Sequence, residues 1–243
     1  VQGFEVGLEL AIEQLENKKV GKVLLINRMD SEHCDFQKAL DSIYENTDLR
    51  GTPVMIPIGK EGSFEGVIDL IKMKAIRPDG ESDIPADMQS AAEDARFHLM
   101  EAIAENDEEL LNYFLEHMEL TEEQMIHGIK TATANGDIVP AFACSAATGV
   151  GVKAFLDGVV AYLPSPAEAA KIEVLSDGEK TEYVCSPDGE LLGYMFKLYS
   201  DPNMGEYVYV RILSGSLKAG TEFYIPEKDA KEKAGNMYYM LGK

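Results

Sequence analysis

The chain has 243 residues, of which 45% are hydrophobic, so it is long enough to bury more than one core. Its 22 basic and 43 acidic residues give a formal net charge of −21, which would repel nucleic-acid phosphates over much of the surface. Composition therefore argues against a general nucleic-acid-binding protein. No apolar run approaches the roughly 20 residues of a membrane span, which argues against a membrane protein.

The cysteines and histidines are scattered along the chain. Cys34, Cys144 and Cys185 are odd in number and widely spaced, so we expect no disulfide framework and predict a reducing, cytoplasmic location. Cys144 is expected to pack as a small apolar side chain. His33 lies beside Cys34 without a second ligand pair nearby, and we therefore predict no metal site.

The first predicted elements are a helix and a strand. Residues 7–20 have apolar side chains at helical spacing, and the apolar run 23–26 predicts a buried strand. Asn27, Arg28, Met29 and Asp30 follow directly, at the carboxyl end of that strand, where open α/β sheets bind ligands. An aspartate there can accept hydrogen bonds from adjacent ring N–H and NH₂ donors, which guanine offers and adenine does not.

The other three residues of this motif have separate expected roles. We expect Asn27 to fasten the flanking loops and Arg28 to lay its side-chain stem over the base plane. Met29 is expected to be a spacer. By itself, an N-[KR]-x-D string is also compatible with an ordinary turn, because Asn and Asp are common turn formers.

The next part of the sequence predicts a helix and then an insert. The helix covers residues 34–46, and the insert begins near Gly51 with strands at 54–58 and 64–71 around a glycine-rich turn at 59–62. One long helix with an apolar face is expected over residues 87–116. Thr121 and Gln124 are spaced as a capping box that starts a further helix.

Acidic side chains are concentrated over residues 101–123 of this insert. They are compatible with a solvated helix face or with docking of a basic partner, and docking predicts binding that weakens with salt. The acidic residues are Glu105, Asp107, Glu108, Glu109, Glu116, Glu119, Glu122 and Glu123.

A second motif follows another predicted buried strand, residues 138–143. The strand runs into Ser145, Ala146 and Ala147, whose small side chains let backbone N–H groups approach the carbonyl oxygen of a base. A strand ending in N-[KR]-x-D and a later strand ending in Ser-Ala together predict the guanine half of a GTP-binding site. The predicted guanine-binding residues are Asn27, Arg28, Asp30, Ser145, Ala146 and Ala147.

The last part of the chain predicts a change of fold. A helix over residues 152–163 ends at Pro164-Ser165-Pro166, which favours a domain boundary. An acidic linker is expected over 167–190, with turns at Asp177-Gly178 and Pro187-Asp188-Gly189. From residue 191 alternating apolar and polar residues predict antiparallel strands. Residues 149–154 also match G-x-G-x-x-A, but the lack of a following parallel strand disfavours a dinucleotide fold.

With these motifs placed, the chain resembles the elongation factor G family of translational GTPases. Residues 1–5 resemble the segment before the family's helix, and residues 27–30 resemble N-K-M-D. Residues 59–70, GKEGSFEGVIDL, resemble the insert hairpin G-x-E-x-x-F-x-G-V-V-D-L. The remaining similar strings are residues 101–115, 144–166 and 196–220.

The resemblance implies an α/β fold, a partial P-loop GTPase-like sheet with an α+β insert, followed by a partial antiparallel β-barrel domain. The expected divisions are 1–50 with 137–166 for the GTPase domain, 51–136 for the insert, 167–190 for the linker and 191–243 for the barrel. It further implies binding of GTP or GDP, action on the ribosome, and contact of the acidic insert with the ribosomal stalk protein. Direct contact with RNA stays open.

Two departures from the family pattern limit this interpretation. Arg28 replaces the usual Lys. No G-x-x-x-x-G-K-[ST] string occurs, and Asp48 to Gly51 matches D-x-x-G only after the base motif, so we interpret it as a turn. Because the chain starts with Val in mid-pattern, we expect an inactive fragment of a longer GTPase, with no catalytic residue here and the Mg²⁺ ligands elsewhere.

Three other functions stay open. One is a ribosomal protection GTPase of the tetracycline-resistance type, which shares these domains. Another is a ribosome-docking protein that no longer hydrolyses GTP. The third is an unrelated acidic α/β binding protein, which would require the insert and barrel similarities to be coincidental.

Overall fold

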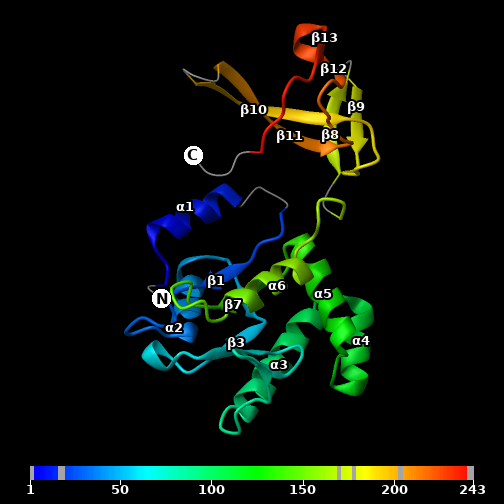
Figure 1. The fold of residues 1–243 in the computed structure, drawn as a ribbon. Coiled ribbons are helices and arrows are strands. Elements are labelled where there is room, and N and C mark those ends of the chain that lie inside the picture. Colours follow the sequence, from blue (N-terminus) through cyan, green and yellow to red (C-terminus); the bar gives the residue numbers. More distant parts are fainter. Residues whose placement is uncertain (1–2, 16–19, 169–170, 177–178, 202–204, 240–243) are drawn as a thin grey trace. The chain divides into compact units, whose positions relative to one another are not determined.

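The computed structural model describes residues 3–15, 20–168, 171–176, 179–201 and 205–239. The chain separates into two compact units, Val1–Pro164 and Ser165–Lys243. The first unit is built on a parallel sheet of three strands, with β7 (Val139–Ala143) between β1 (Leu24–Ile26) and β2 (Gly51–Pro53) (Figure 1). The two strands predicted from apolar runs are therefore confirmed and are direct neighbours. β7 is buried throughout, whereas Leu25 in the middle of β1 is 37% exposed.

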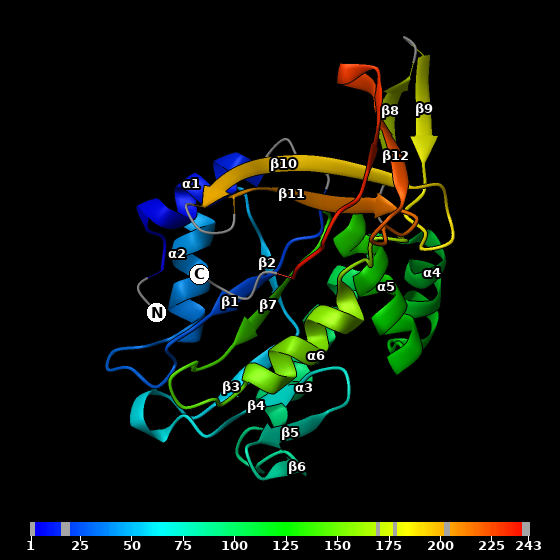
Figure 2. The same ribbon diagram turned by 45° about the horizontal axis from the view of Figure 1, so that its top comes forward.

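Helices cover both faces of this sheet. Successive residues of a strand point to opposite faces. Ala141 and Leu40 of α2 (Phe36–Asn46) lie on one face, since both would touch a Cβ added at Gly51. Phe142 points to the other face, where α6 (Val152–Tyr162) packs with ring contacts from Phe155 and Tyr162 at centroid distances of 5.2 and 6.3 Å. Figure 2 shows α2 and α6 on different sides of the strands. The predicted first helix is α1 (Val6–Leu15), and residues 16–19 lie outside the described part.

The third strand of the parallel sheet was not predicted from the sequence. Gly51–Pro53 was expected to open the insert, with Gly51 in a turn, but this segment pairs in parallel with β7. The cause is tertiary: Gly51 lies against Leu24 Cδ1, which would be 2.6 Å from an added Cβ. Val54 then connects the parallel sheet to the antiparallel sheet that follows it in the chain. Its N–H donates to Ala141 O at 3.1 Å, and its carbonyl oxygen accepts from Leu70 N, directly after β4, at 3.2 Å.

A four-stranded antiparallel sheet follows, in the order β3 (Met55–Ile58), β4 (Gly66–Asp69), β5 (Lys74–Arg77) and β6 (Gly80–Ser82), with a short 3₁₀ helix η1 (Glu61–Ser63) after β3. The hairpin predicted around residues 59–62 is confirmed by the β3–β4 pairing. Gly59 has φ +74°, and an added Cβ would lie 2.1 Å from Ser63 O, so this turn requires glycine.

The single long helix predicted over residues 87–116 is wrong. The structure has two helices there, α3 (Gln89–Ala104) and α4 (Glu108–His117). The break occurs because Asp107 adopts an extended conformation and its carboxylate accepts from the N–H groups of Glu109 and Leu110, which begins a new helix. The predicted capping box of Thr121 and Gln124 is confirmed at the start of α5 (Glu122–Asn135).

The second unit consists of hairpins. They are β8 (Ile172–Ser176) with β9 (Glu179–Tyr183), β10 (Leu192–Asp201) with β11 (Gly205–Ser214), and β12 (Glu222–Ile225) with β13 (Ala230–Lys233), with η2 (Pro226–Lys228) between the last two. The first hairpin occupies the expected linker, since its alternating residues pair over the whole of both strands. Within the described residues these two-stranded sheets do not close into a barrel.

The two turns predicted in that linker have different outcomes. The turn at Pro187-Asp188-Gly189 is confirmed by the hydrogen bond from Gly189 N to Ser186 O at 3.2 Å. The turn at Asp177-Gly178 lies outside the described residues. No parallel strand follows α6 in the described part of the chain, which agrees with the rejection of a dinucleotide fold.

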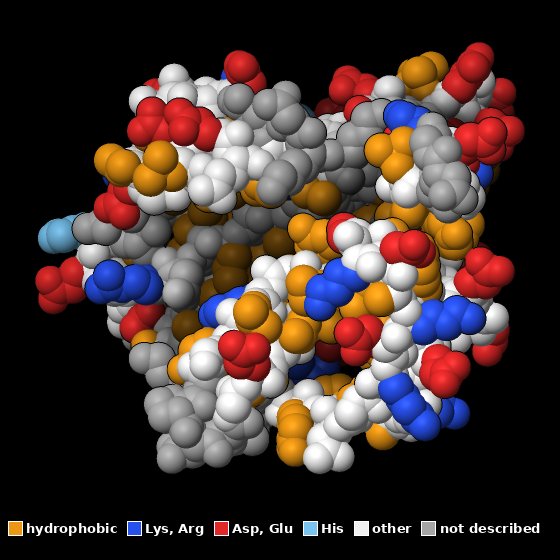
Figure 3. Space-filling view, turned by 90° about the horizontal axis from the view of Figure 1, so that it is seen from above, with side chains coloured by type: hydrophobic (Ala, Val, Ile, Leu, Met, Phe, Trp, Pro, Cys, Tyr) orange, Lys and Arg blue, Asp and Glu red, His pale blue; other side chains and the backbone are white. Residues whose placement is uncertain are grey.

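The surface reflects the acidic composition. On the face shown in Figure 3, acidic side chains are scattered between exposed apolar ones rather than gathered at one place. No helix among the described residues is long and apolar enough to cross a membrane.

Candidate functional site

The two predicted base motifs meet at one edge of the parallel sheet. Because β1 and β7 are parallel neighbours, with Ile26 opposite Ala143, their carboxyl ends lie side by side. The loops that follow are joined by two backbone hydrogen bonds, from Cys144 N to Ile26 O at 3.0 Å and from Met29 N to Cys144 O at 3.1 Å. The tertiary structure thus brings together residues 27–30 and 144–147.

Asn27 fastens these loops to each other, as predicted. Its Oδ1 atom accepts a hydrogen bond from the N–H of Arg28 at 2.7 Å and from the N–H of Ala146 at 2.9 Å, across 119 positions of sequence. The Cys144 thiol donates to the same oxygen at 3.5 Å. Burial raises the pKa of Cys144, so the sulfur remains a thiol and keeps its donor role at neutral pH.

Asp30 contains an unsatisfied polar atom at this edge. Its Oδ1 is buried and has no hydrogen-bond partner within the described part of the chain. A buried carboxylate oxygen without a donor is unfavourable, so such atoms mark places where a ligand or water supplies one. Asp30 thus carries a carboxylate oxygen at this edge whose hydrogen-bonding capacity is not met by the described residues.

The loop after β7 has a backbone donor near the site without an acceptor among the described residues. Ser145 is fully buried, its N–H donates to Val150 O at 2.9 Å, and its Oγ accepts from Thr148 N at 3.2 Å. Ala146 and Ala147 are exposed, and the N–H of Ala146 is already used by Asn27. In the described residues the N–H of Ala147 has no acceptor, which leaves it able to donate to a ligand.

Met29 does more than the predicted spacing. Its side chain is 1% exposed and lies among the largest fully buried side chains, a packing role that the sequence did not predict. The apolar thioether is removed from water when the loop folds back over the sheet edge. Arg28, in contrast, is exposed and has a left-handed φ of +65°, an uncommon conformation for a side chain of this size.

Sequence reasoning missed two residues beside this loop, Cys34 and Glu61. The Cys34 thiol donates to Met29 O at 2.7 Å, and the Glu61 N–H donates to the same carbonyl oxygen at 3.0 Å. The only sequence signal was the position of Glu61 in the insert string, because a contact between residues 29 and 61 leaves no local pattern.

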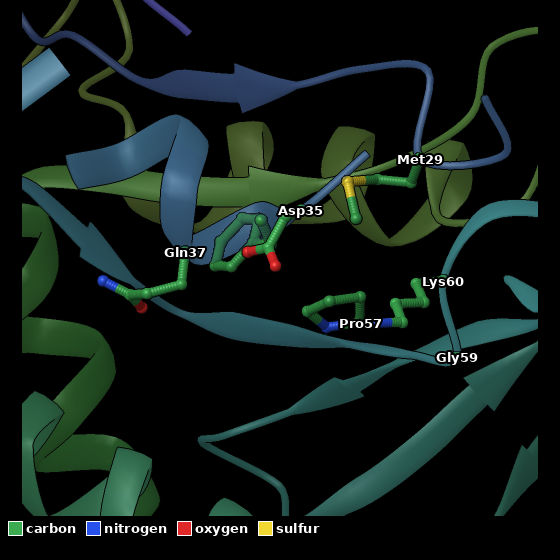
Figure 4. A pocket seen from close by; sticks show the side chains of 7 residues that line it. Met29, Asp35, Gln37, Pro57, Gly59 and Lys60 are labelled. Carbon is green, nitrogen blue, oxygen red and sulfur yellow. The ribbon is translucent and has the colours of Figure 1, made fainter. Parts of the chain in front are cut away.

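A cavity of about 450 Å³ adjoins these contacts. Met29 and the first turn of α2 line one side, and the end of β3 with Gly59 and Lys60 lines the other (Figure 4). Its remaining lining residues are Asp35, Phe36, Gln37 and Pro57. Among the described residues no group of three or more His, Cys, Asp or Glu side chains could hold a metal ion.

Comparison with known proteins agrees with this geometry. Residues 1–165 match the family model of the elongation factor Tu GTP binding domain. The whole chain is also similar to a crystal structure of a protein from Thermus thermophilus, with a TM-score of 0.80 and 26% sequence identity over 99% of this chain. The similarity covers 34% of that protein, so this chain spans about a third of its length.

The family match covers more than half of the chain and includes both strands and both loops of the site. The chain therefore belongs to the family of the elongation factor Tu GTP binding domain.

Proposed function

We propose that this chain is the base-selecting part of a GTP-binding translation factor of the elongation factor G type, which acts on the ribosome in the cytosol. The carrying observation is the buried Asp30 Oδ1 atom without a partner, beside two loops that Asn27 joins. Guanine presents a ring N–H next to an exocyclic NH₂ group, and the two oxygens of one carboxylate can accept both. The residues present therefore fit a guanine nucleotide.

Each remaining site residue has a role in this proposal. The free N–H of Ala147 donates to the carbonyl oxygen of the base, which rejects adenine because adenine has an amino group there. Arg28 lays its side-chain stem over the base plane. Asn27, Ser145 and Ala146 hold the loops at the spacing that lets both ends of the base be recognised.

The proposal assigns the base, and not the phosphates, to residues 1–243. The sequence contains no G-x-x-x-x-G-K-[ST] string, which is the loop that cradles phosphates and presents a hydroxyl to Mg²⁺. The second unit is proposed as the start of a β-barrel domain. In support, Phe196 and Tyr199 on β10 are 57% and 43% exposed, and a longer sheet would cover such apolar side chains.

The acidic part of the insert is proposed to dock a basic ribosomal protein such as the stalk protein. Seven of its eight acidic side chains are exposed on or beside α4 and α5, whereas Asp107 is used as a helix cap. An exposed acidic surface attracts a basic partner over distances comparable to the Debye length. Co-sedimentation of the protein with ribosomes should therefore weaken when salt is raised, and salt-independent binding would contradict this part.

The test of the main proposal is a titration of the intact protein with GDP, GTP and ATP. Guanine nucleotides should bind, and Asp30→Asn should weaken their binding by about 1–3 kcal/mol because one charged acceptor is lost. Asp41→Asn on α2 is the matched control, since that carboxylate accepts from the exposed Gln37 side chain of its own helix. Equal binding of ATP and GTP, or no effect of Asp30→Asn, would refute guanine selection.

A second measurement separates the alternatives that share this site. GTP turnover by the intact protein with and without ribosomes distinguishes a hydrolysing factor from a docking protein that only binds nucleotide. Stimulated turnover supports a translational GTPase. Binding without turnover would favour the docking protein.

A further inference from the structure

The turn of the insert hairpin is joined to the base loop, residues 27–35 between β1 and α2, by three hydrogen bonds, and a fourth lies within the base loop. The Glu61 N–H donates to Met29 O at 3.0 Å and also points at Cys34 Sγ at 3.3 Å. The Cys34 thiol donates to Met29 O at 2.7 Å, and Glu61 Oε1 accepts from the N–H of His33 at 2.8 Å. We call these four residues, Met29, His33, Cys34 and Glu61, the junction.

The junction fixes the peptide unit that leads into Asp30. The Met29 carbonyl belongs to the peptide bond between Met29 and Asp30, and it accepts from both Glu61 and Cys34. On its other side, the N–H of Met29 donates to Cys144 O. Met29 is thus held from the insert and from the sheet, and these bonds set the direction in which the Asp30 side chain leaves the backbone.

Unfavourable backbone conformations cluster here and need this support. Arg28, His33 and Glu61 have φ values of +65°, +62° and +55°, three of the six non-glycine residues with positive φ among the described residues. Left-handed conformations of such residues persist only where surrounding contacts over-determine them. Without the junction, the loop would relax toward more common conformations, and Asp30 would lose its fixed position.

A hollow that opens to solvent lies beside the junction. The cavity of about 450 Å³ separates the start of α2 from the end of β3, with Met29 on one side and Gly59 on the other (Figure 4). A filled, close-packed contact would hold the loop by shape alone. On the side of Met29 that faces this hollow, the hydrogen bonds of Glu61 and Cys34 hold the loop in addition to packing.

We propose that Glu61 and Cys34 are positioning residues for base selection, so that the insert turn sets how well Asp30 discriminates guanine. This inference rests on the proposed function and adds two residues that touch no nucleotide. It also makes base recognition and the insert turn thermodynamically coupled, because a bond that orients Asp30 for guanine is in turn stabilised when guanine binds.

The test compares binding of GDP with inosine diphosphate, which lacks the 2-amino group. The wild-type protein should prefer GDP by about tenfold, because inosine leaves one oxygen of Asp30 without its donor. Glu61→Ala removes the carboxylate that accepts from His33 N but keeps the Glu61 N–H bond to Met29 O, and Cys34→Ala removes the thiol that donates to Met29 O. Each should lower this preference by about threefold or more. Glu61→Gln and Cys34→Ser should retain most of it, since the glutamine amide oxygen can still accept from His33 and the serine hydroxyl can still donate to Met29.

Glu65→Ala is the matched control in the same hairpin. Its carboxylate bonds Arg77 at 2.9 Å and makes no bond to the base loop in the described structure, so the preference for GDP should stay at the wild-type value. A double-mutant cycle adds a readout that a general loss of stability would not produce. In the Asp30→Asn background, Glu61→Ala should cause no further loss of GDP preference.

The outcomes separate this inference from the proposed function. If the wild-type protein prefers GTP to ATP but does not distinguish GDP from inosine diphosphate, Asp30 does not recognise the 2-amino group, and this inference fails while guanine selection over adenine stands. If ATP and GTP bind equally, the proposed function itself fails. If the wild-type protein prefers GDP but Glu61→Ala and Cys34→Ala leave the preference unchanged, the positioning role is overturned while the proposed function stands. Amide hydrogen exchange gives a check without mutation: GDP should slow exchange of the Glu61 N–H, and unchanged exchange at full occupancy would also overturn the inference.

Discussion

Removal of the Asn27 side-chain amide should loosen the connection between the two base loops. Asn27 Oδ1 accepts two backbone N–H groups, at 2.7 and 2.9 Å, and a weaker thiol contact at 3.5 Å. Each ordinary hydrogen bond contributes a net of about 0.5–1.5 kcal/mol, which gives about 1–3 kcal/mol for two bonds. Arg28 and Ala146 are exposed, so water can replace part of the loss. We therefore expect Asn27→Ala to lower the free energy of unfolding by about 1–2 kcal/mol.

The assay combines denaturation with amide exchange. For a chain of 243 residues, a loss of this size should lower the melting temperature by about 2–8 °C. The N–H of Ala146 should also exchange faster, because its acceptor is gone. Asn27→Asp is the matched control, since it keeps an oxygen that can accept both N–H groups and should stay within about 0.5 kcal/mol of wild type. The reasoning is refuted if Asn27→Ala leaves both the stability and the exchange of Ala146 unchanged.

Three further predictions concern the scaffold of the site. Gly158→Ala would place a Cβ 2.4 Å from Phe142 Cε1. This overpacking should lower the free energy of unfolding in urea by about 1–3 kcal/mol. An unchanged urea midpoint would contradict the packing of α6 on β7. Thr121→Ala removes the helix cap of α5 and should cost about 1 kcal/mol in the same assay, whereas Thr121→Ser should cost little. At pH 8, Cys144 should react with iodoacetamide more slowly than Cys185, because Cys144 is buried and burial raises the pKa of its thiol. Equal labelling of the two cysteines, measured by mass spectrometry, would contradict this prediction.

Features that depend on neighbouring residues could be predicted from the sequence. The apolar runs before Asn27 and Cys144 predicted the two buried strands, and the spacing of Thr121 and Gln124 predicted the capping box. The glycine-rich segment predicted the β3–β4 turn, where Gly59 has the left-handed conformation that glycine adopts without a steric penalty. These patterns are local, because side-chain periodicity and capping act over a few residues.

Other features were decided only by contacts between distant parts of the chain. A three-residue segment at Gly51 carries too little pattern to indicate a sheet, and it becomes a strand because β7 offers it a parallel edge. The burial of Met29 was not predicted, because it depends on contacts of its loop with distant parts of the chain. The break at Asp107 was missed because helix propensity continues on both sides, and a single cap decides it.

The candidate site shows the same division. The sequence by itself determined which residue types could recognise a guanine base, since Asp30 and the small residues after β7 stand directly after apolar runs. The tertiary structure decided that Asn27 reaches Ala146 across 119 positions and that Glu61 holds the carbonyl of Met29. The physical reason is that hydrogen bonds between distant segments form only when parallel pairing of β1 with β7, and the passage of β2 into β3, bring those segments to the same edge.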